Sequence, residues 1–235
     1  MTRKAIDPKK RLIVALDLST VDEARRAVDA LGDAVSFYKV GMQLVFAGGL
    51  DFVRELRQAG HDVFLDMKLL DIANTVEKGI ASIAGLGVQF TTIHAYPQAM
   101  EAAVRGRGAD GLKVLGVTVL TSLDDDDLEQ AGFSESVEAL VRRRAVQARK
   151  AGLDGLVCSP LEAEKLRRLI GDDMALVTPG VRPAGSDSGD QKRVATPAST
   201  IRAGSDYLVV GRPVLEAGAP RDAARRIVDE IAGAL

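Results

Sequence analysis

The sequence predicts a single (β/α)8 barrel, in which eight parallel strands alternate with helices. Apolar runs of strand length alternate with amphipathic segments of helix length along the 235 residues, and eight such pairs can be counted. The pattern Ala-Gly-x-Asp lies between a predicted helix and an apolar run at 59–62, 151–154 and 203–206. A glycine that ends a helix before a short loop explains this pattern. No linker interrupts the alternation, so we expect one domain over residues 1–235.

The predicted strands are continuously apolar, which is typical of parallel strands covered on both faces. The first runs from Leu12 and ends in Asp17. An open, doubly wound sheet is the rival architecture, but it would usually have fewer strands and a dinucleotide-binding loop. No G-x-G-x-x-G motif follows the first strand, which favours the barrel. We predict strands at residues 12–17, 35–40, 61–68, 89–95, 113–120, 155–158, 175–178 and 207–210.

The helices are predicted from apolar periodicity and from capping residues. Thr20 is a suitable N-cap, Glu23 completes a capping box, and Gly32 ends the first helix. After the sixth strand, the tetrapeptide Ser-Pro-Leu-Glu at 159–162 supplies an N-cap, a proline at the first helical position and a glutamate at the third. Other predicted helices include residues 44–56, 72–86, 97–107, 137–151 and 221–232.

Composition and charge exclude several classes of protein. The net charge of -2 gives no reason, on charge grounds, to expect a surface that binds nucleic acid or a membrane. The single cysteine, Cys158, excludes an intrachain disulfide and a cysteine-based zinc cluster. No run is long and apolar enough to span a bilayer, and the basic N-terminus lacks the apolar region of a signal peptide. We therefore expect a soluble cytoplasmic protein.

Polar residues at the ends of the predicted strands are the candidates for an active site, because barrels of this type build it there. Asp66 and Lys68 should point the same way, since side chains two apart on a strand share a face. Asp71 lies beyond that strand, near the start of the next helix, where an acidic residue suits the helix dipole. Strand ends also carry Asp17, Lys39, His94, Thr121, Ser122, Cys158 and Ser159.

The chemistry of the charged group can be narrowed by elimination. Asp66 and Asp71 favour the protonated form of Lys68, which disfavours imine or pyridoxal phosphate chemistry. The carboxylates could bind a divalent cation, but Lys39 and Lys68 would repel it, so metal dependence is also disfavoured. An array in which lysines and aspartates alternate, with a protonated amine in the middle, is suited to stabilising a developing carbanion and then protonating it. The array therefore disfavours both an imine-forming cofactor and a bound metal.

The last two strands end in a different kind of motif. Thr-Pro-Gly-Val-Arg at 178–182 and Gly211-Arg212 follow them, and barrels frequently bind phosphate with these two loops. Arg212 can add a charge-assisted contact. The segment 179–193 has the composition of a lid, from which Arg182 and Gln191 could reach a ligand. The alternative is a surface loop with a solvated arginine.

Other polar residues are expected to be structural. His94 should be packed or hydrogen-bonded, because no catalytic partner is evident, and Cys158 should be a buried thiol. The run Arg142-Arg143-Arg144 should lie along an exposed helix face. The acidic segment 124–127 should form a solvated loop and the start of a helix.

Several motifs together resemble those of the orotidine 5'-monophosphate decarboxylase family, over nearly the whole chain. The central one is Asp66-x-Lys68-x-x-Asp71, which a wider suprafamily of phosphate-binding barrels shares. Lys39 and the two motifs after the last strands make the resemblance more specific. The matching segments are 16–17, 39–41, 66–71, 120–122, 179–182, 190–193 and 210–213.

The resemblance implies a lyase that converts orotidine 5'-monophosphate to UMP and CO2 in de novo pyrimidine biosynthesis, without a cofactor. It implies that Lys39, Asp66, Lys68 and Asp71 surround the scissile carboxylate, with Lys68 protonating C6 of the pyrimidine. A homodimer is implied, in which Asp71, Ile72 and Thr75 act in the partner's site. The implied substrate-binding residues are Asp17 and Lys39 at the ribose, Thr121 and Ser122 at the pyrimidine, Arg182, Gln191, Gly211 and Arg212 at the phosphate, and also Asp66, Ile72, Thr75 and Pro179.

Two alternatives remain open. A sugar-phosphate enzyme similar to 3-keto-L-gulonate 6-phosphate decarboxylase would share the central signature, but such enzymes use a metal-binding acid where this chain has Lys39. A non-catalytic nucleotide-binding barrel is disfavoured by the intact Lys68 and Asp71. The segment Ala95-Tyr96-Pro97-Gln98 departs from the small, glycine-containing loop of the family, so the fourth loop is not described by the resemblance.

Overall fold

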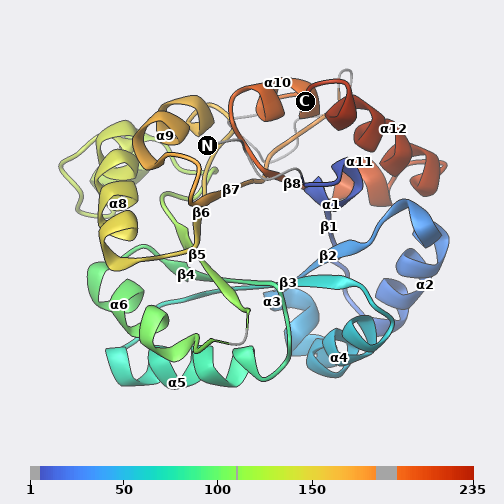
Figure 1. The fold of residues 1–235 in the computed structure, drawn as a ribbon, viewed down its shortest axis with the longest axis horizontal. Coiled ribbons are helices and arrows are strands. Elements are labelled where there is room, and N and C mark those ends of the chain that lie inside the picture. Colours follow the sequence, from blue (N-terminus) through green and yellow to red (C-terminus); the bar gives the residue numbers. More distant parts are fainter. Residues whose placement is uncertain (1–5, 110, 184–194) are drawn as a thin grey trace.

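Eight parallel strands close into a barrel, each pairing with its neighbour in sequence and β8 pairing with β1. The computed structural model describes residues 6–109, 111–183 and 195–235, and its helices surround the barrel (Figure 1). The predicted (β/α)8 barrel is confirmed. The strands are Leu12–Ala15 (β1), Phe37–Gly41 (β2), Asp62–Leu69 (β3), Phe90–His94 (β4), Lys113–Val117 (β5), Gly155–Val157 (β6), Ala175–Thr178 (β7) and Tyr207–Val210 (β8).

The first long helix begins and ends where its capping residues predict. The Thr20 hydroxyl accepts a hydrogen bond from the Glu23 amide, the Glu23 carboxylate caps the Thr20 amide, and Gly32 ends the helix with a φ of 51°. The helices are Pro8–Arg11 (α1), Val21–Leu31 (α2), Met42–Leu44 (α3), Leu50–Gln58 (α4), Ala73–Ala84 (α5), Pro97–Gly106 (α6), Asp125–Gln130 (α7), Val137–Ala151 (α8), Ala163–Ile170 (α9), Pro197–Arg202 (α10), Arg212–Leu215 (α11) and Pro220–Ala232 (α12), with short turns of other helix types at Gly32–Ala34 (η1) and Val45–Gly49 (η2).

Two of the helix predictions are wrong in detail. The helix predicted over 44–56 is interrupted, because Ala47 and Gly48 leave the helical region and Gly48 has a φ of 91°. The helix after β6 begins at Ala163 rather than at residue 160. Ser159 and Glu162 form a turn instead, in which the Ser159 amide donates to the Glu162 carboxylate at 3.0 Å. The capping pattern therefore predicts a helix start about one turn before the observed one.

The interior of the barrel is apolar toward the N-terminal ends of the strands. Three rings gather around Phe90, with centroid distances of 5.3 Å to Phe37, 6.0 Å to Phe64 and 5.0 Å to Tyr207. Fully burying a side chain of this size contributes about 1.5–3 kcal/mol of stability. These rings close the barrel below its C-terminal end, where the charged residues lie. The buried interior cluster is Ile13, Ala15, Phe37, Phe64, Phe90, Leu115, Val177 and Val209.

Candidate active site

The charged residues of the first three strands meet because of the alternation of side chains along a strand. Asp17, Lys39 and Asp66 each stand two residues beyond an apolar member of the interior cluster. Each therefore faces the barrel axis, one layer nearer to the C-terminal end of the sheet. In the strand register, Lys39 is opposite Phe64 and Gly41 is opposite Asp66.

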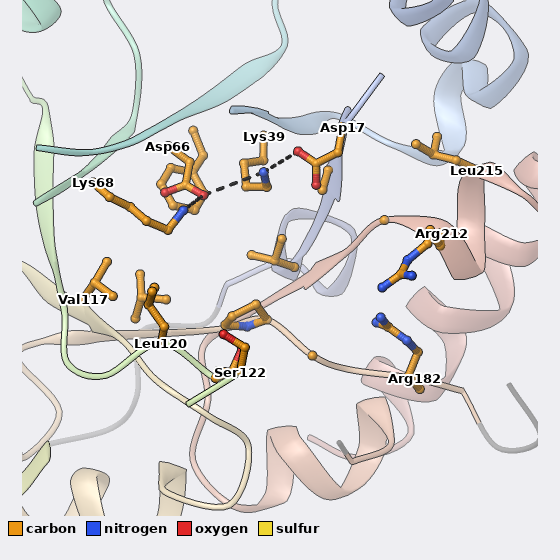
Figure 2. Close-up of a pocket in the computed structure, with 18 of the residues that line it drawn as sticks. Asp17, Lys39, Asp66, Lys68, Val117, Leu120, Ser122, Arg182, Arg212 and Leu215 are labelled. Carbon is orange, nitrogen blue, oxygen red and sulfur yellow. Dashed lines mark hydrogen bonds and ion pairs between the residues drawn. The ribbon is translucent and has the colours of Figure 1, made fainter. Parts of the chain in front are cut away.

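These side chains form a row in which positive and negative groups alternate (Figure 2). Lys39 Nζ lies 2.8 Å from Asp17 Oδ1 and 3.7 Å from Asp66 Oδ2, while Lys68 Nζ lies 2.7 Å from the same Asp66 oxygen. The side chains of Lys39 and Asp66 are each only 10% exposed, whereas that of Lys68 is 26% exposed. The predicted pairing of Asp66 with Lys68 is present. Because the Lys68 side chain is only partly buried, its ammonium is accessible from the cavity.

Asp66 is ionised because of its neighbours. Burial alone would raise the pKa of its carboxyl, but the charges of Lys39 and Lys68, with hydrogen bonds from Lys68 and Thr92, hold the pKa below its ordinary value. A buried carboxylate of this kind, between two ammonium groups, keeps a fixed negative charge at the deep end of the site.

Lys68 adopts an unusual backbone conformation. Its φ of 49° places it in the left-handed region, and among the described residues it is the one non-glycine residue with a positive φ. The register between β3 and β4 also shifts between Leu65 and Leu69. Left-handed backbone costs a side-chain-bearing residue about 1–2 kcal/mol, so surrounding contacts must hold Lys68 there. Simple alternation therefore explains the direction of Asp66 but not the whole geometry of Lys68.

The opposite wall is formed by the segment after β5, which ends at Val117 rather than at the predicted residue 120. Arg144 supports this segment from α8: its guanidinium donates to the Thr118 carbonyl and stacks 4.8 Å from the centroid of the Tyr96 ring and 5.6 Å from that of Phe133. The prediction of an exposed Arg144 is wrong, because the residue is only 8% exposed. Tyr96, from the loop that departs from the family pattern, is thus a packing partner of the arginine.

Two arginines lie across the cavity from the charged row. Arg182 follows β7 and Arg212 follows β8, and their guanidinium groups point toward one another in Figure 2. Gly180 and Gly211 line the same end. Two cations that converge on one space favour an anion between them, and a phosphate has the charge and the acceptor oxygens for this role.

One cavity of about 610 Å³ joins the charged row to the arginine pair. Its size is that of a small-molecule site. Apolar side chains, among them Val119, Leu120 and Leu215, cover part of its wall. The predicted site residues that line it are Asp17, Lys39, Asp66, Lys68, Thr121, Ser122, Pro179, Arg182, Gly211 and Arg212.

The other predicted site residues are not at this cavity within one chain. Asp71 and Thr75 are exposed, and Ile72 has an exposed fraction of 69%. A carboxylate oxygen of Asp71 accepts a hydrogen bond from the Ile72 amide at 2.6 Å. Gln191, with most of the predicted lid at 179–193, lies outside the described residues.

His94 and Cys158 have the structural surroundings that were predicted. His94 is half-buried, and burial together with the charges of Arg144 and Lys68 lowers its pKa, against the opposing effect of Asp66. Cys158 is buried, with its sulfur 3.9 Å from the Thr178 hydroxyl. Sequence reasoning missed Thr92, which contacts Asp66, and also the apolar wall. The apolar wall could have been found from the alternation that places Leu115 and then Val117 on the interior face.

Two further observations concern the described part of the chain as a whole. None of its helices has the length and apolarity needed to cross a membrane. Within the same residues, no group of three or more His, Cys, Asp and Glu side chains is arranged to hold a metal ion.

Comparisons with known proteins agree with this architecture. The family model described as "Orotidine 5'-phosphate decarboxylase / HUMPS family" matches residues 10–227. A protein of Rhodopseudomonas palustris (strain BisA53) named orotidine 5'-phosphate decarboxylase is 58% identical over 229 residues, which are 97% of each chain. A protein of the same name from Bradyrhizobium diazoefficiens is 57% identical over 235 residues, covering 100% of this chain and 99% of its own. The crystal structure of orotidine 5'-phosphate decarboxylase from Lactobacillus acidophilus superposes with a TM-score of 0.83 at 39% identity, covering 94% of this chain and 98% of that one.

Proposed function

This chain belongs to the orotidine 5'-phosphate decarboxylase / HUMPS family, and we propose that it converts orotidine 5'-monophosphate to UMP and CO2 in pyrimidine biosynthesis. The observation that carries the proposal is one continuous cavity with the row Asp17–Lys39–Asp66–Lys68 at one end and Arg182 with Arg212 at the other. A nucleoside monophosphate has matching ends, because it carries a phosphate at one end and a ring with its reacting group at the other.

In the proposed reaction, the bond between C6 and the carboxylate carbon breaks and its electron pair stays on C6. The ammonium of Lys68 stabilises this developing carbanion and then transfers a proton to it, while CO2 leaves. Asp66 holds the Lys68 ammonium in place through the contact of 2.7 Å. Lys39, held between Asp17 and Asp66, fits the proposed role at the ribose hydroxyls.

The phosphate lies far from the reacting carbon in this scheme. Its contacts with Arg182 and Arg212 therefore assist the reaction through positioning, not through charge at the reacting atoms. Thr121 and Ser122, from the wall that Arg144 supports, fit the proposed role beside the pyrimidine.

The reaction as proposed needs neither metal nor cofactor. The test is the loss of orotidine 5'-monophosphate absorbance with purified protein in the presence of EDTA. Turnover that is the same with and without EDTA is the expected result. An absolute requirement for added magnesium would favour the sugar-phosphate alternative and reject this proposal.

We also propose a homodimer in which Asp71, Ile72 and Thr75 complete the partner's site. Supporting this, the rim around the ends of β2 and β3 exposes large apolar side chains: Phe46 is 81% exposed, Ile72 69%, Leu70 48%, Met42 47% and Leu50 40%. Such a group of exposed apolar residues is typical of a protein interface.

Subunit complementation tests this arrangement. Lys68→Ala and Asp71→Ala should each be inactive alone. After mixing and exchange of subunits, each mixed dimer would contain one site with both residues intact, so activity should return. Failure of the mixture to recover activity, with dimers shown by sedimentation, would reject the role of Asp71 in the partner's site.

A further inference from the structure

Thr92, on β4, is buried directly beneath the charged row. The residue has no exposed surface. It stands two residues after Phe90 of the interior cluster, so its side chain faces the barrel axis as those of Asp66 and Lys39 do. Its hydroxyl donates a hydrogen bond to Asp66 Oδ1 at 2.7 Å and accepts one from the Lys68 amide at 2.9 Å.

A threonine hydroxyl has one proton, and here that proton is committed to the Asp66 carboxylate. A lone pair of the same oxygen is committed to the Lys68 amide. Lys68 Nζ contacts the other Asp66 oxygen, Oδ2, at 2.7 Å. The carboxylate is therefore held from both of its oxygens, which fixes its rotation as well as its position.

The strand register explains why a side chain is needed at this point. Leu65 is paired with Thr91 and Leu69 with Ile93, so residues 66–68 of β3 face only residue 92 of β4. One residue of β4 cannot supply regular backbone hydrogen bonds to three residues of β3. The hydroxyl of Thr92 takes the place of a backbone acceptor for Lys68, the residue with the left-handed backbone.

We propose that Thr92 is a positioning residue for the decarboxylation, which orients the Asp66 carboxylate and holds the backbone of Lys68 so that its ammonium points into the cavity. This inference rests on the proposed function. It goes beyond that function because Thr92, which would not touch the substrate, sets the position of the proposed proton donor. A misplacement of a reacting group by about 1 Å can lower a rate on the order of 100-fold.

The neighbouring residue supplies a matched control. Thr91 is equally buried, and its hydroxyl donates to the Leu65 carbonyl of the same strand β3 at 2.9 Å. It is adjacent to Thr92, so its side chain points away from the barrel axis, toward the helices. Thr91→Val and Thr92→Val therefore remove the same group from the same pair of strands, on opposite faces of the sheet.

The experiment compares Thr92→Val, Thr92→Ser and Thr91→Val with the unaltered protein, in steady-state decarboxylation of orotidine 5'-monophosphate. Thr92→Val should lower kcat about 10- to 100-fold with KM changed less than about threefold, because the residue holds the reacting groups rather than the phosphate. Thr92→Ser keeps the hydroxyl and should recover most of kcat. Thr91→Val should keep kcat, and melting curves should show that all three variants are folded.

The pH dependence supplies a readout that a purely structural role would not change. The groups that face the Asp66 carboxylate are Lys39 from β2, Lys68 from β3, and Thr92 and His94 from β4. The hydrogen bond from Thr92 is one of the contacts that lower the pKa of Asp66. Removing this hydrogen bond should therefore raise that pKa and move the acidic limb of the pH profile of kcat to higher pH. Thr92→Ser should return the limb to its original position.

These results separate the two proposals. If the unaltered protein does not turn over orotidine 5'-monophosphate, the proposed function fails, and the role of Thr92 is decided by carbon-13 NMR titration of Asp66. A higher Asp66 pKa in Thr92→Val but not in Thr92→Ser or Thr91→Val supports the role. A Thr92→Val protein that matches Thr91→Val in kcat, acidic limb and Asp66 titration overturns it.

Discussion

At one end of the cavity, Lys39 and Lys68 each lie against a carboxylate of the same chain, whereas at the other end Arg182 and Arg212 point toward one another. The first group is nearly neutral and is organised before any ligand arrives. The second brings two guanidinium groups together where the phosphate of the proposed substrate would bind. Under the proposed function, the end with paired charges supplies the chemistry and the arginine end supplies binding energy.

The largest expected effect tests the end with paired charges. Lys68→Ala should lower kcat on the order of 10⁴-fold, because it removes both the proton donor and the cation beside the reacting carbon. Stopped-assay product quantification would measure the residual rate. Lys165→Ala, which removes an exposed lysine paired with Glu138 on the outer surface, is the control and should keep full activity. Full turnover by Lys68→Ala would reject its role as proton donor for any substrate.

A smaller effect is expected at the arginine pair. Arg212→Ala should lower kcat/KM for the phosphorylated substrate about 10- to 100-fold, since one charge-assisted contact contributes about 1.5–3 kcal/mol. The rate constant for orotidine, which lacks the phosphate, should be the same for Arg212→Ala as for the unaltered protein. Equal losses with both substrates would show that Arg212 acts at the reacting end, and the contrast between the two ends would fail.

Gly41 allows a more local test of the charged row. A Cβ atom at this position would lie 3.1 Å from Lys39 Nζ and 3.2 Å from Asp17 Oδ1, while the backbone there is extended and suits any residue. Gly41→Ala should therefore displace that ion pair and lower kcat/KM roughly fivefold, equivalent to about 1 kcal/mol. Gly218→Ala, where a Cβ would meet no atom within 4 Å, is the control. Unchanged kinetics for both variants would show that catalysis does not depend on the exact position of the Lys39–Asp17 ion pair.

The smallest effect concerns stability in acid. The ordinary pKa of an aspartate is 3.8, and the pKa of Asp66 in the folded protein is lower than this. The ionised form of Asp66 therefore stabilises the fold at neutral pH. This contribution is fully present above the unfolded pKa and is lost as pH falls through the folded one. The difference in unfolding free energy between the unaltered protein and Asp66→Asn should therefore be constant from pH 7 to pH 5 and shrink below about pH 4. A difference that already shrinks between pH 7 and pH 5 would contradict the lowered pKa.

The two ends of the cavity were predictable from sequence because each depends on a local pattern. Alternation along a strand places Asp17, Lys39 and Asp66 on the interior face, and that rule needs only the strand assignment. The glycine and arginine motifs after β7 and β8 follow from the usual position of phosphate sites in such barrels. The capping residues Thr20, Glu23 and Gly32 likewise predicted the bounds of α2.

The supporting contacts could not be predicted in this way. Thr92 meets Asp66 because three residues of β3 face one of β4, and a register shift of this kind has no signature in either strand alone. Arg144 belongs to a run of three arginines, which favoured an exposed face. Its spacing from the buried residues Leu140, Val141 and Ala148 gave the opposite indication, and the structure follows that spacing.

The rings around Phe90 also determine the routes by which molecules travel. Within the described residues, Phe37, Phe64, Phe90 and Tyr207 pack against one another below the charged row, toward the N-terminal ends of the strands. In the proposed reaction, CO2 forms at the deep end beside Lys68 and the nucleotide occupies the path outward. The aromatic floor then leaves the mouth at the C-terminal end as the route for substrate, UMP and CO2 alike.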